Sequence, residues 1–192
     1  MGVVYEAEQL SLRRRVALKT LPFASTLDPR HLQRFQNEAL AAAHLHHTHI
    51  VPVHSVGTDR GIHYYAMQYI DGASVAELIE VLRRERGAQG NGHEGHADSS
   101  ASLRALTHGS SVDSRDYSRS VARLGVQAAD ALHHAHEQGV VHRDVKPANL
   151  LVDRGGALWV TDFGLASIRN TTGPTITGDL VGTVRYMSPE QT

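Results

Sequence analysis

The sequence contains no cysteine among its 192 residues. This absence excludes disulfide bonds, thiolate zinc sites and a cysteine nucleophile, and it leaves the redox compartment open. A charge excess is also lacking: 19 Lys and Arg against 20 Asp and Glu give a formal net charge of −1, so no basic surplus indicates a nucleic-acid partner. No apolar run approaches the length of a membrane span, of about 18 residues, and the N-terminus lacks the apolar segment of a signal peptide.

The composition that is present is typical of a folded protein. Hydrophobic residues make up 41% of the chain and charged residues 20%, which suffices for a hydrophobic core and argues against wholesale disorder. The length predicts one domain of ordinary size, because domains commonly hold about 100–200 residues. The 14 histidines make metal binding the first functional hypothesis to weigh.

The first part of the chain is predicted to be rich in β structure, with one helix. Alternation of apolar and polar residues indicates strands, and apolar residues at helical spacing after Asp28-Pro29 indicate a helix. The expected elements are strands over 2–7 and 15–20, a helix of about three to four turns whose apolar positions run from Leu32 to Ala43, and a hairpin of strands 50–56 and 63–69 joined by a turn at 57–61.

The remainder is predicted to be mainly helical, interrupted by a flexible insertion. Ser74 can cap a short helix that ends in the charged run 83–87. Residues from 87 to about 114 are rich in Gly, Ser, His and Asn and are expected to be flexible. A long helix with an apolar stripe from Val121 to Ala135 then ends at Gly139, and short strands follow at 140–142, 150–152 and 158–161, the last two joined by a turn at 153–156.

Four motifs stand in a fixed order along the chain. Residues 142–149 read HRDVKPAN and fit H-R-D-x-x-x-x-N; residues 162–164 read DFG; residues 16–19 read VALK, close to V-A-I-K; and residues 188–190 read SPE in place of A-P-E. Each motif alone is weak evidence for a family, but all four occur in the required order and on the expected types of element. The chain therefore resembles the eukaryotic-like (Hanks-type) serine/threonine protein kinases of bacteria.

The resemblance implies an α+β fold with two lobes: a small lobe over 1–70, and a partial large lobe over 71–192 that holds the catalytic and activation loops. Gly2 and Val4 match only the last two named positions of the G-x-G-x-x-G-x-V loop, and the chain stops just after Glu190. The kinase fold is therefore expected to be incomplete, without its first strand and without the helices after the activation segment. We expect the isolated polypeptide to be poorly stable or inactive.

The resemblance also implies roles for individual residues in phosphoryl transfer, which depends on positioning and charge stabilisation. Asp144 would orient the attacking hydroxyl and accept its proton, and Lys146 would neutralise the γ-phosphate. Asp162 and Asn149 would bind Mg²⁺ through oxygen atoms. Lys19 would contact the phosphates of ATP and be held by Glu38. The alternative for Lys19 is a solvated strand lysine, against which the VALK motif and the glutamate 19 residues later argue. The alternative for each Asp or Asn is a turn-forming residue, which explains one of them but not all of them together.

A nucleotide pocket and a regulatory segment follow from the same resemblance. The adenine would lie between Val4 and Ala17 above and Leu151 below, with Met67 as gatekeeper and backbone bonds from Gln68, Tyr69 and Ile70; simple core packing explains the same apolar residues. In the activation loop, Thr175 and Thr177 are the favoured phosphorylation sites, with Arg143 as the phosphate's partner. Solvation alone would also explain these threonines, and Thr183 is expected to bond the catalytic aspartate instead.

The leading hypothesis is an ATP- and Mg²⁺-dependent protein kinase that phosphorylates Ser and Thr of proteins, with autophosphorylation in trans as a candidate reaction. The alternative is an inactive truncated kinase, or a pseudokinase-like nucleotide-binding or interaction module. A cytoplasmic location follows from the need for ATP, and the full-length gene product could be membrane-anchored. Most histidines fit the family pattern, with His142 packed under the DFG phenylalanine; only His93, His96 and His108, in the insertion, are left for a weak metal site.

Overall fold

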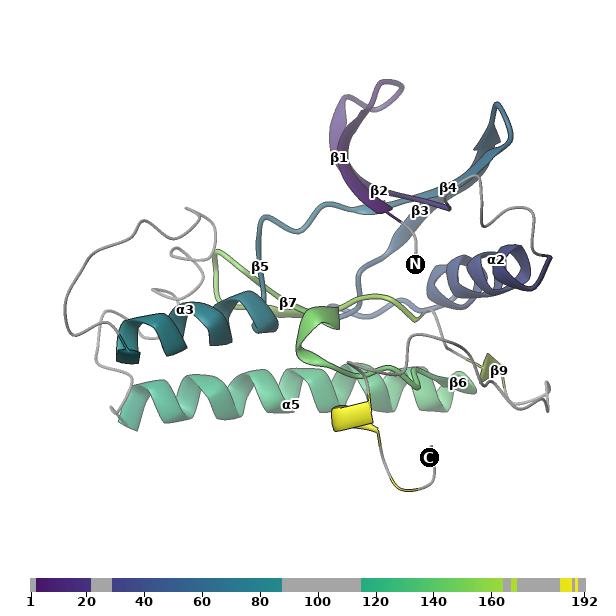
Figure 1. The fold of residues 1–192 in the computed structure, drawn as a ribbon. Helices are drawn as coiled ribbons and strands as arrows, with labels where there is room; N and C mark the ends of the chain where they lie inside the picture. Colours follow the sequence, from purple (N-terminus) through teal and green to yellow (C-terminus); the bar gives the residue numbers. More distant parts are fainter. Residues whose placement is uncertain are drawn as a thin grey trace.

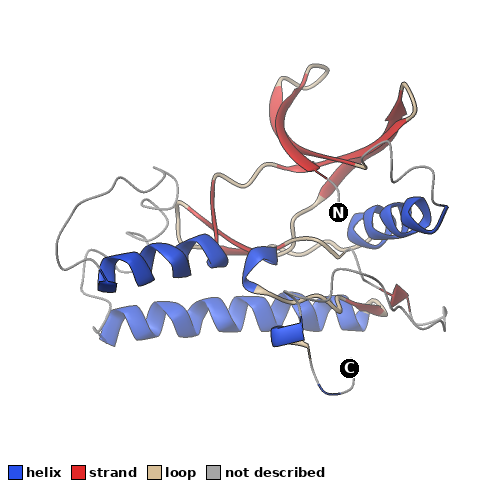
Figure 2. Cartoon of the chain, viewed as in Figure 1, coloured by secondary structure: helices blue, strands red, loops and turns tan. Residues whose placement is uncertain are grey.

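The computed structural model describes residues 3–21, 29–87, 115–163, 167–168, 184–187 and 189. A curved antiparallel sheet forms the upper part of the molecule in Figure 1, and helices α3 (Val75–Gly87) and α5 (Arg115–Glu137) lie side by side below it. Helix α2 (Pro29–Ala43) lies beside the sheet. Figure 2 shows the same separation, with strands dominating the upper part and helices the lower part.

The upper sheet has four antiparallel strands in the order β1-β2-β4-β3. Its strands are β1 (Val3–Gln9), β2 (Arg14–Thr20), β3 (Val53–Asp59) and β4 (Ile62–Gln68). Strand β2 is central, so the VALK motif is paired on both sides, with Ala17 opposite Met67 and Lys19 opposite Tyr65. The strands predicted over 2–7 and 15–20 are confirmed as β1 and β2, with ends that differ by one or two residues.

The predicted hairpin exists, but the turn predicted at 57–61 is shorter, because β3 continues to Asp59. The turn consists of Arg60 and Gly61, both with positive φ of 47° and 78°, as in the two-residue turns that fit the twist of a hairpin. Gly57 instead lies inside β3, where a Cβ would meet the hydroxyl of Tyr64 at 2.5 Å. The glycine therefore makes room for a cross-strand ring, and Ile50, expected in the strand, forms only a parallel bridge to Val160.

Short strands complete the lower part. A three-stranded sheet has the order β5-β7-β8, from β5 (Gly72–Ser74), β7 (Leu150–Asp153) and β8 (Leu158–Val160), and β6 (Val140–Val141) pairs with β9 (Ser167–Ile168). Strands β5 and β9 were not predicted, because two or three residues give too little pattern. The predicted turn after Asp153 is confirmed, and its carboxylate accepts hydrogen bonds from the N–H groups of Gly155 and Ala157.

The helices differ from the prediction at their ends. Helix α3 continues to Gly87 through the charged run that was expected to end it, since Arg and Glu are good helix formers and Glu80 pairs with Arg84. Helix α5 begins at Arg115, and Val121, predicted to lie in its apolar stripe, is exposed. The predicted end is confirmed by Gly139, whose φ of 76° suits only glycine comfortably.

Two apolar clusters form most of the core, one in the lower part and one under the upper sheet. One joins α5, the end of α2 and β8 and includes Leu45, Ile50, Ala131, Val160 and Phe163. The other joins the upper sheet to α2, with Phe35 against Tyr65 at a ring distance of 5.2 Å. Within the described residues, no helix is long and apolar enough to cross a membrane. The predicted insertion at 88–114 lies outside the described residues.

Candidate active site

The segment after β6 brings three predicted site residues together. The 3-10 turn η1 (Pro147–Asn149) follows it directly. Lys146 Nζ lies 2.8 Å from Asp144 Oδ2, and Asn149 Nδ2 donates hydrogen bonds to the main-chain oxygen of Asp144 at 2.8 Å and to its Oδ2 at 3.1 Å. In the 3-10 turn the N–H of Asn149 donates to the carbonyl oxygen of Lys146, and this fold brings the Asn149 side chain to Asp144.

The carboxylate of Asp144 is held by one oxygen and open at the other. Asp144 is only 9% exposed. Among the residues that the structure describes, no donor bonds its Oδ1, which is the single buried side-chain polar atom left without a partner there. A buried carboxylate oxygen normally finds a donor, because leaving it unpaired costs free energy. This oxygen is therefore positioned to accept a hydrogen bond from a group outside the described structure.

His142 supports the backbone of this segment from below. It is 1% exposed, its Nδ1 accepts a hydrogen bond from the N–H of Asp144, and its Nε2 lies 3.0 Å from the carbonyl oxygen of Thr161. Because Nδ1 accepts, Nε2 carries the proton and donates to Thr161. Burial lowers the pKa of His142, and the carbonyl of Thr161 partly offsets that effect. The neutral ring thus links the HRD and DFG motifs.

Phe163 lies on His142, as predicted. The two rings are 4.6 Å apart and tilted by 46°, and Phe163 is 1% exposed within the lower apolar cluster. Asp162 precedes it with a φ of 60° and Arg143 has a φ of 63°, both in the left-handed region that costs a non-glycine residue free energy. Asp162 faces Lys19 of the upper sheet, while the next residue, Phe163, remains in the lower core.

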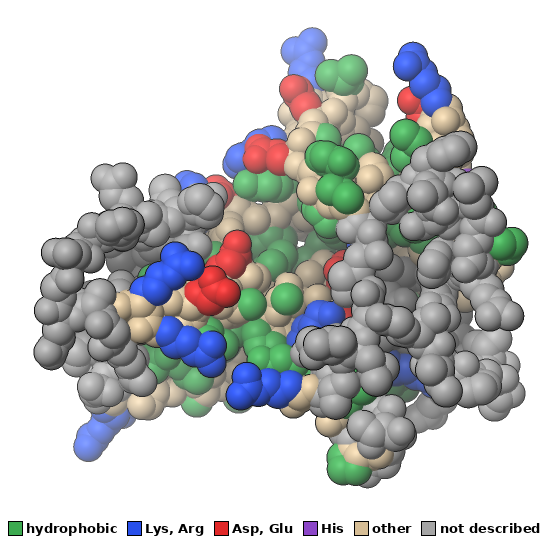
Figure 3. All heavy atoms as spheres, in the orientation of Figure 1, with side chains coloured by type: hydrophobic (Ala, Val, Ile, Leu, Met, Phe, Trp, Pro, Cys, Tyr) green, Lys and Arg blue, Asp and Glu red, His purple; other side chains and the backbone are tan. Residues whose placement is uncertain are grey.

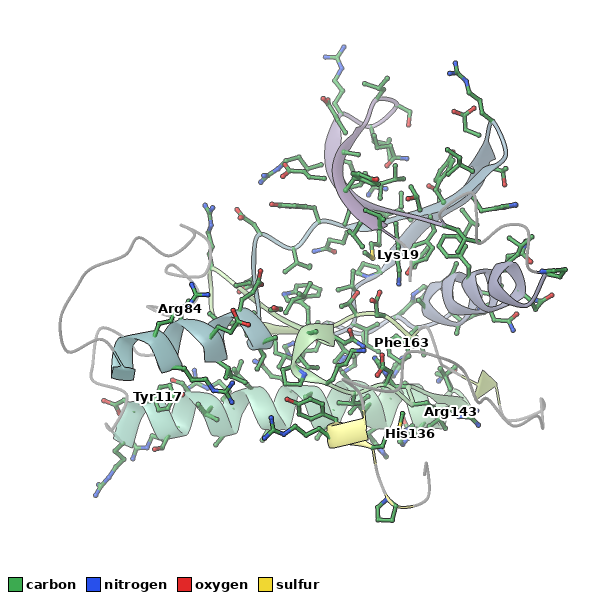
Figure 4. All side chains as sticks on the ribbon, in the orientation of Figure 1. Lys19, Arg84, Tyr117, His136, Arg143 and Phe163 are labelled. Atoms are coloured by element: carbon green, nitrogen blue, oxygen red, sulfur yellow. The ribbon has the colours of Figure 1, made fainter. Side chains whose placement is uncertain are left out.

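Lys19 and Asp162 meet between the upper sheet and the lower part. Figure 4 shows Lys19 on the lower side of the sheet and Phe163 beneath it. Lys19 Nζ lies 2.8 Å from Asp162 Oδ1, and the side chains are 9% and 32% exposed respectively. The pair joins residues that are far apart in the sequence, so it depends on how the two parts of the chain pack.

Several predicted site residues are outside this geometry. Glu38 lies in α2, but its side chain is outside the described part, so the predicted pair with Lys19 remains a prediction. Gly2 and the threonines at 175, 177 and 183 also lie outside the described residues. Arg143 is described and exposed, and Figure 4 labels it near the C-terminal end of α5, away from Lys19.

The residues predicted to line the nucleotide pocket come from the upper sheet, from the segment after β4 and from β7. Ala17 pairs with Met67, which is 8% exposed and accepts a long contact of 4.0 Å from the hydroxyl of Thr161. Val4 is opposite Lys19 on β1 and 49% exposed. The segment Gln68, Tyr69 and Ile70 follows β4, and Leu151 lies in β7 opposite Ser74 and Trp159.

The donor set of Asn149 and Asp162 suits a magnesium ion. The amide nitrogen of Asn149 is used by Asp144, which directs its carbonyl oxygen elsewhere. The carboxylate of Asp162 is about one-third exposed and uses one oxygen for Lys19. Hard cations such as Mg²⁺ prefer carboxylate and carbonyl oxygens and keep several waters. The described residues hold no group of three or more His, Asp or Glu side chains arranged for a metal, so a site here needs ligands from substrate or water.

A histidine cluster joins the loop after α2 to α5. The rings of His47 and His134 stack at 5.2 Å, and His47 lies 5.7 Å from the ring of His49. His49 bonds the carbonyl oxygen of Leu158 at 2.8 Å. This cluster thus lies where the loop after α2 meets the end of α5, whereas His93, His96 and His108 are outside the described residues.

Comparison with known protein families decides what this site belongs to. The family model described as "Protein kinase domain" matches residues 1–192. The chain belongs to the protein kinase domain family. Its mixed helix and sheet structure is accordingly the two-lobed kinase fold, of which the chain covers a part.

Relatives of this kinase chain include named bacterial enzymes. It is 34% identical over 191 residues to serine/threonine-protein kinase PrkC of Bacillus subtilis, covering 100% of this chain and 25% of that protein. It is 32% identical to serine/threonine-protein kinase PknB of Mycobacterium leprae, covering 100% and 26%. The crystal structure of the Mycobacterium tuberculosis PknI kinase domain is 29% identical with a TM-score of 0.55, covering 87% of this chain and 56% of that one. The chain thus spans about a quarter of the curated relatives.

Acidification is expected to destabilise the kinase fold. Burial lowers the pKa of His142, His47 and His54 below 6.5 in the folded state, so the unfolded chain binds more protons as pH falls below about 6.5. One titrating group changes the free energy of unfolding by at most about 1.4 kcal/mol per pH unit, and the fully buried His142 is expected to contribute most of the effect. We expect the midpoint of urea unfolding of the full-length protein to be lower at about pH 5.5 than at about pH 7.5. In His142→Gln, the free energy of unfolding should depend less steeply on pH.

The exposed His133 supplies the control for this prediction, because His133→Gln is expected to keep the wild-type slope. A midpoint that stays constant or rises on acidification would contradict the prediction.

Proposed function

We propose that this chain is the catalytic part of a protein serine/threonine kinase that transfers the γ-phosphoryl group of ATP to Ser and Thr hydroxyls of proteins. The single observation that carries the proposal is the buried Asp144, whose Oδ2 is held by Lys146 and Asn149 and whose Oδ1 is open. A base for phosphoryl transfer needs this combination of a fixed carboxylate and one accessible oxygen. Family membership and the named relatives support it.

The residues divide the reaction between them. Asp144 Oδ1 accepts a hydrogen bond from the substrate hydroxyl, orients it and takes its proton as the new oxygen–phosphorus bond forms and the bond to ADP breaks. Lys146, held against the same carboxylate, offers its ammonium to the transferred phosphate. When bound, ATP and Mg²⁺ supply the phosphoryl group and neutralise the charge that develops on it. Asp162 and Asn149 would hold the metal, and Lys19 would hold the phosphates.

The nucleotide would bind below the upper sheet. Val4 and Ala17 would cover the adenine from above and Leu151 from below, with backbone bonds from Gln68 to Ile70 beside Met67. Glu38 would hold Lys19 in place from α2, and Gly2 would lie near the phosphates. The small lobe would span 1–70 and the large-lobe segment 71–192. ATP as the donor places the reaction in the cytoplasm.

Regulation would come from the activation segment. A phosphate on Thr175 or Thr177 would pair with Arg143, whose guanidinium can make two-pronged bonds to phosphate. Thr183 would bond Asp144 in the ordered segment. Autophosphorylation between two copies of the protein is the simplest source of this phosphate.

Incubation of the full-length protein with Mg²⁺, radiolabelled ATP and a basic protein substrate tests the proposal. We expect label on serine and threonine after acid hydrolysis, with peptide mass spectrometry finding phosphate at Thr175 or Thr177. If the protein binds ATP but transfers no phosphate in either its phosphorylated or dephosphorylated form, the pseudokinase-like alternative replaces the proposal.

A further inference from the structure

The short connection between the upper sheet and β5 carries a set of charged contacts that the proposed chemistry does not use. Residues 69–71 lead from β4 to β5. Asp71 directs its two carboxylate oxygens to two arginines from different parts of the fold, Arg154 and Arg15. We call these three residues the Asp71 bridge.

The lower half of the bridge is firmly tied. Arg154 Nε lies 3.2 Å from Asp71 Oδ1, and the N–H of Arg154 donates to the carbonyl oxygen of Asp71 at 3.1 Å. The next residue, Gly72, is so close to β7 that a Cβ would collide with the carbonyl oxygen of Val152. Asp71 therefore lies directly before β5 and is fixed to the lower three-stranded sheet. It cannot move away from that sheet unless the contacts with Arg154 and the β5–β7 pairing break.

The upper half of the bridge is the ion pair between Arg15 and Asp71, which is longer than the pair with Arg154. Arg15 NH2 lies 3.8 Å from Asp71 Oδ2, and its guanidinium lies 4.6 Å from the centre of the Tyr69 ring. Arg15 also reaches Glu6 of β1 at 3.4 Å. By strand alternation Arg15 shares the face of β2 that carries Ala17 and Lys19. In the orientation of Figure 3, basic and acidic side chains lie next to one another over the upper sheet.

The asymmetry makes Arg15 the breakable end of the bridge. The side chains of Arg15 and Arg154 are similarly exposed, at 58% and 54%, so water and salt weaken both ion pairs. The difference lies in the shorter distance to Arg154 and in its main-chain hydrogen bond to Asp71, which Arg15 lacks. If β2 moves away from the lower sheet, Lys19 on β2 separates from Asp162. Such a movement lengthens the Arg15 contact and leaves Arg154 in place, because Arg154 and Asp71 move together.

We propose that Arg15 is a positioning residue that holds β2 against Asp71 and so slows the opening through which nucleotide leaves. The proposal rests on the proposed function, since it assumes that the nucleotide lies between Lys19 and Asp162. Arg15 acts through the placement of β2 and makes no contact with the reacting groups. Tyr69 contributes by stacking under the guanidinium, which a lysine would use less well.

Stopped-flow release of a fluorescent ATP analogue from the full-length protein tests the proposal. We expect Arg15→Gln to release the analogue about two- to fivefold faster, the range that an exposed ion pair can supply, and to raise KM for ATP without lowering kcat. Raising the salt concentration should speed release from the wild type and have less effect on the variant. Arg15→Lys should fall between them.

A double-mutant cycle with Asp71→Asn adds a readout that a loss of stability would not give. The two substitutions should be less than additive on the release rate, because each removes the same contact. Arg14→Gln is the matched control: Arg14 is the neighbouring strand residue, bonds Gln9 at 2.7 Å and makes no described contact with Asp71. It should release nucleotide at the wild-type rate.

The results separate this proposal from the proposed function. If the wild type transfers phosphate and Arg15→Gln releases nucleotide at the wild-type rate, or the cycle is fully additive, the role of Arg15 is overturned and the kinase function stands. If the wild type binds the analogue and transfers no phosphate, the proposed function fails, while faster release from Arg15→Gln would still support the bridge.

Discussion

Asp144→Asn is expected to lower the rate of phosphoryl transfer by about 10²–10⁴-fold, the contribution typical of a positioned general base. The substitution keeps the size of the side chain and removes its capacity to take a proton. It also weakens the hold on Lys146, whose ammonium lies 2.8 Å from Oδ2. Both losses fall on the transition state, so kcat should drop while binding of ATP changes little.

The measurement is single-turnover transfer of radiolabelled phosphate by the full-length protein, together with nucleotide affinity by fluorescence. Asp116→Asn is the matched control, because Asp116 lies on α5 in an exposed pair with Arg119 and should leave the rate unchanged. Wild-type transfer by Asp144→Asn would show that the open carboxylate oxygen is not the base and would remove the main support for the proposed function.

Phe163→Ala is expected to lower the free energy of unfolding by about 3–5 kcal/mol, the usual cost of emptying a buried phenylalanine site. Phe163 is one of the largest fully buried side chains and packs on His142, Leu45 and Ile50 within the lower cluster. Its removal leaves a cavity between α5, β8 and the catalytic segment. A loss of this size approaches the whole stability of a small domain, so the variant should be largely unfolded near 37 °C.

Urea unfolding followed by tryptophan fluorescence and circular dichroism measures this effect. Phe163→Leu keeps most of the buried volume and should lose much less, while Tyr186→Ala, at a residue 48% exposed, should change the midpoint little. A loss below about 1 kcal/mol in Phe163→Ala would mean that the ring does not carry the packing that its burial indicates.

Local features of the fold were predictable where the sequence carries a strong local signal. The helical spacing after Pro29, the alternation in β2 and the turn at Asp153 each depend on neighbouring residues, and all three are confirmed. The hairpin turn was predicted to start too early because Gly57 signals a turn by composition, whereas in the structure it lies in β3 and leaves room for the ring of Tyr64 from the adjacent strand. That role involves a cross-strand partner that no local pattern reveals.

The site shows the same division. The order of the motifs predicted that Lys19, Asp144, Asn149 and Asp162 act together. The structure places them in two groups: Asp144 contacts Lys146 and Asn149, and Lys19 contacts Asp162. The contact between Lys19 and Asp162 connects distant parts of the chain. The Asp71 bridge was not predicted at all, because Arg15, Asp71 and Arg154 are ordinary charged residues with no motif spacing.

The sequence by itself determined the family and the chemical groups, because a reaction that depends on charge placement requires particular side chains in a particular order, and that order is written in the chain. Only the tertiary structure determined the contacts of these groups. It shows that Asp144 Oδ1 has no hydrogen-bond donor among the described residues, that Lys19 pairs with Asp162, and that Arg15 and Arg154 contact Asp71. These distances follow from the packing of the two sheets and α5, which sums many weak contacts over the whole chain and has no local signature.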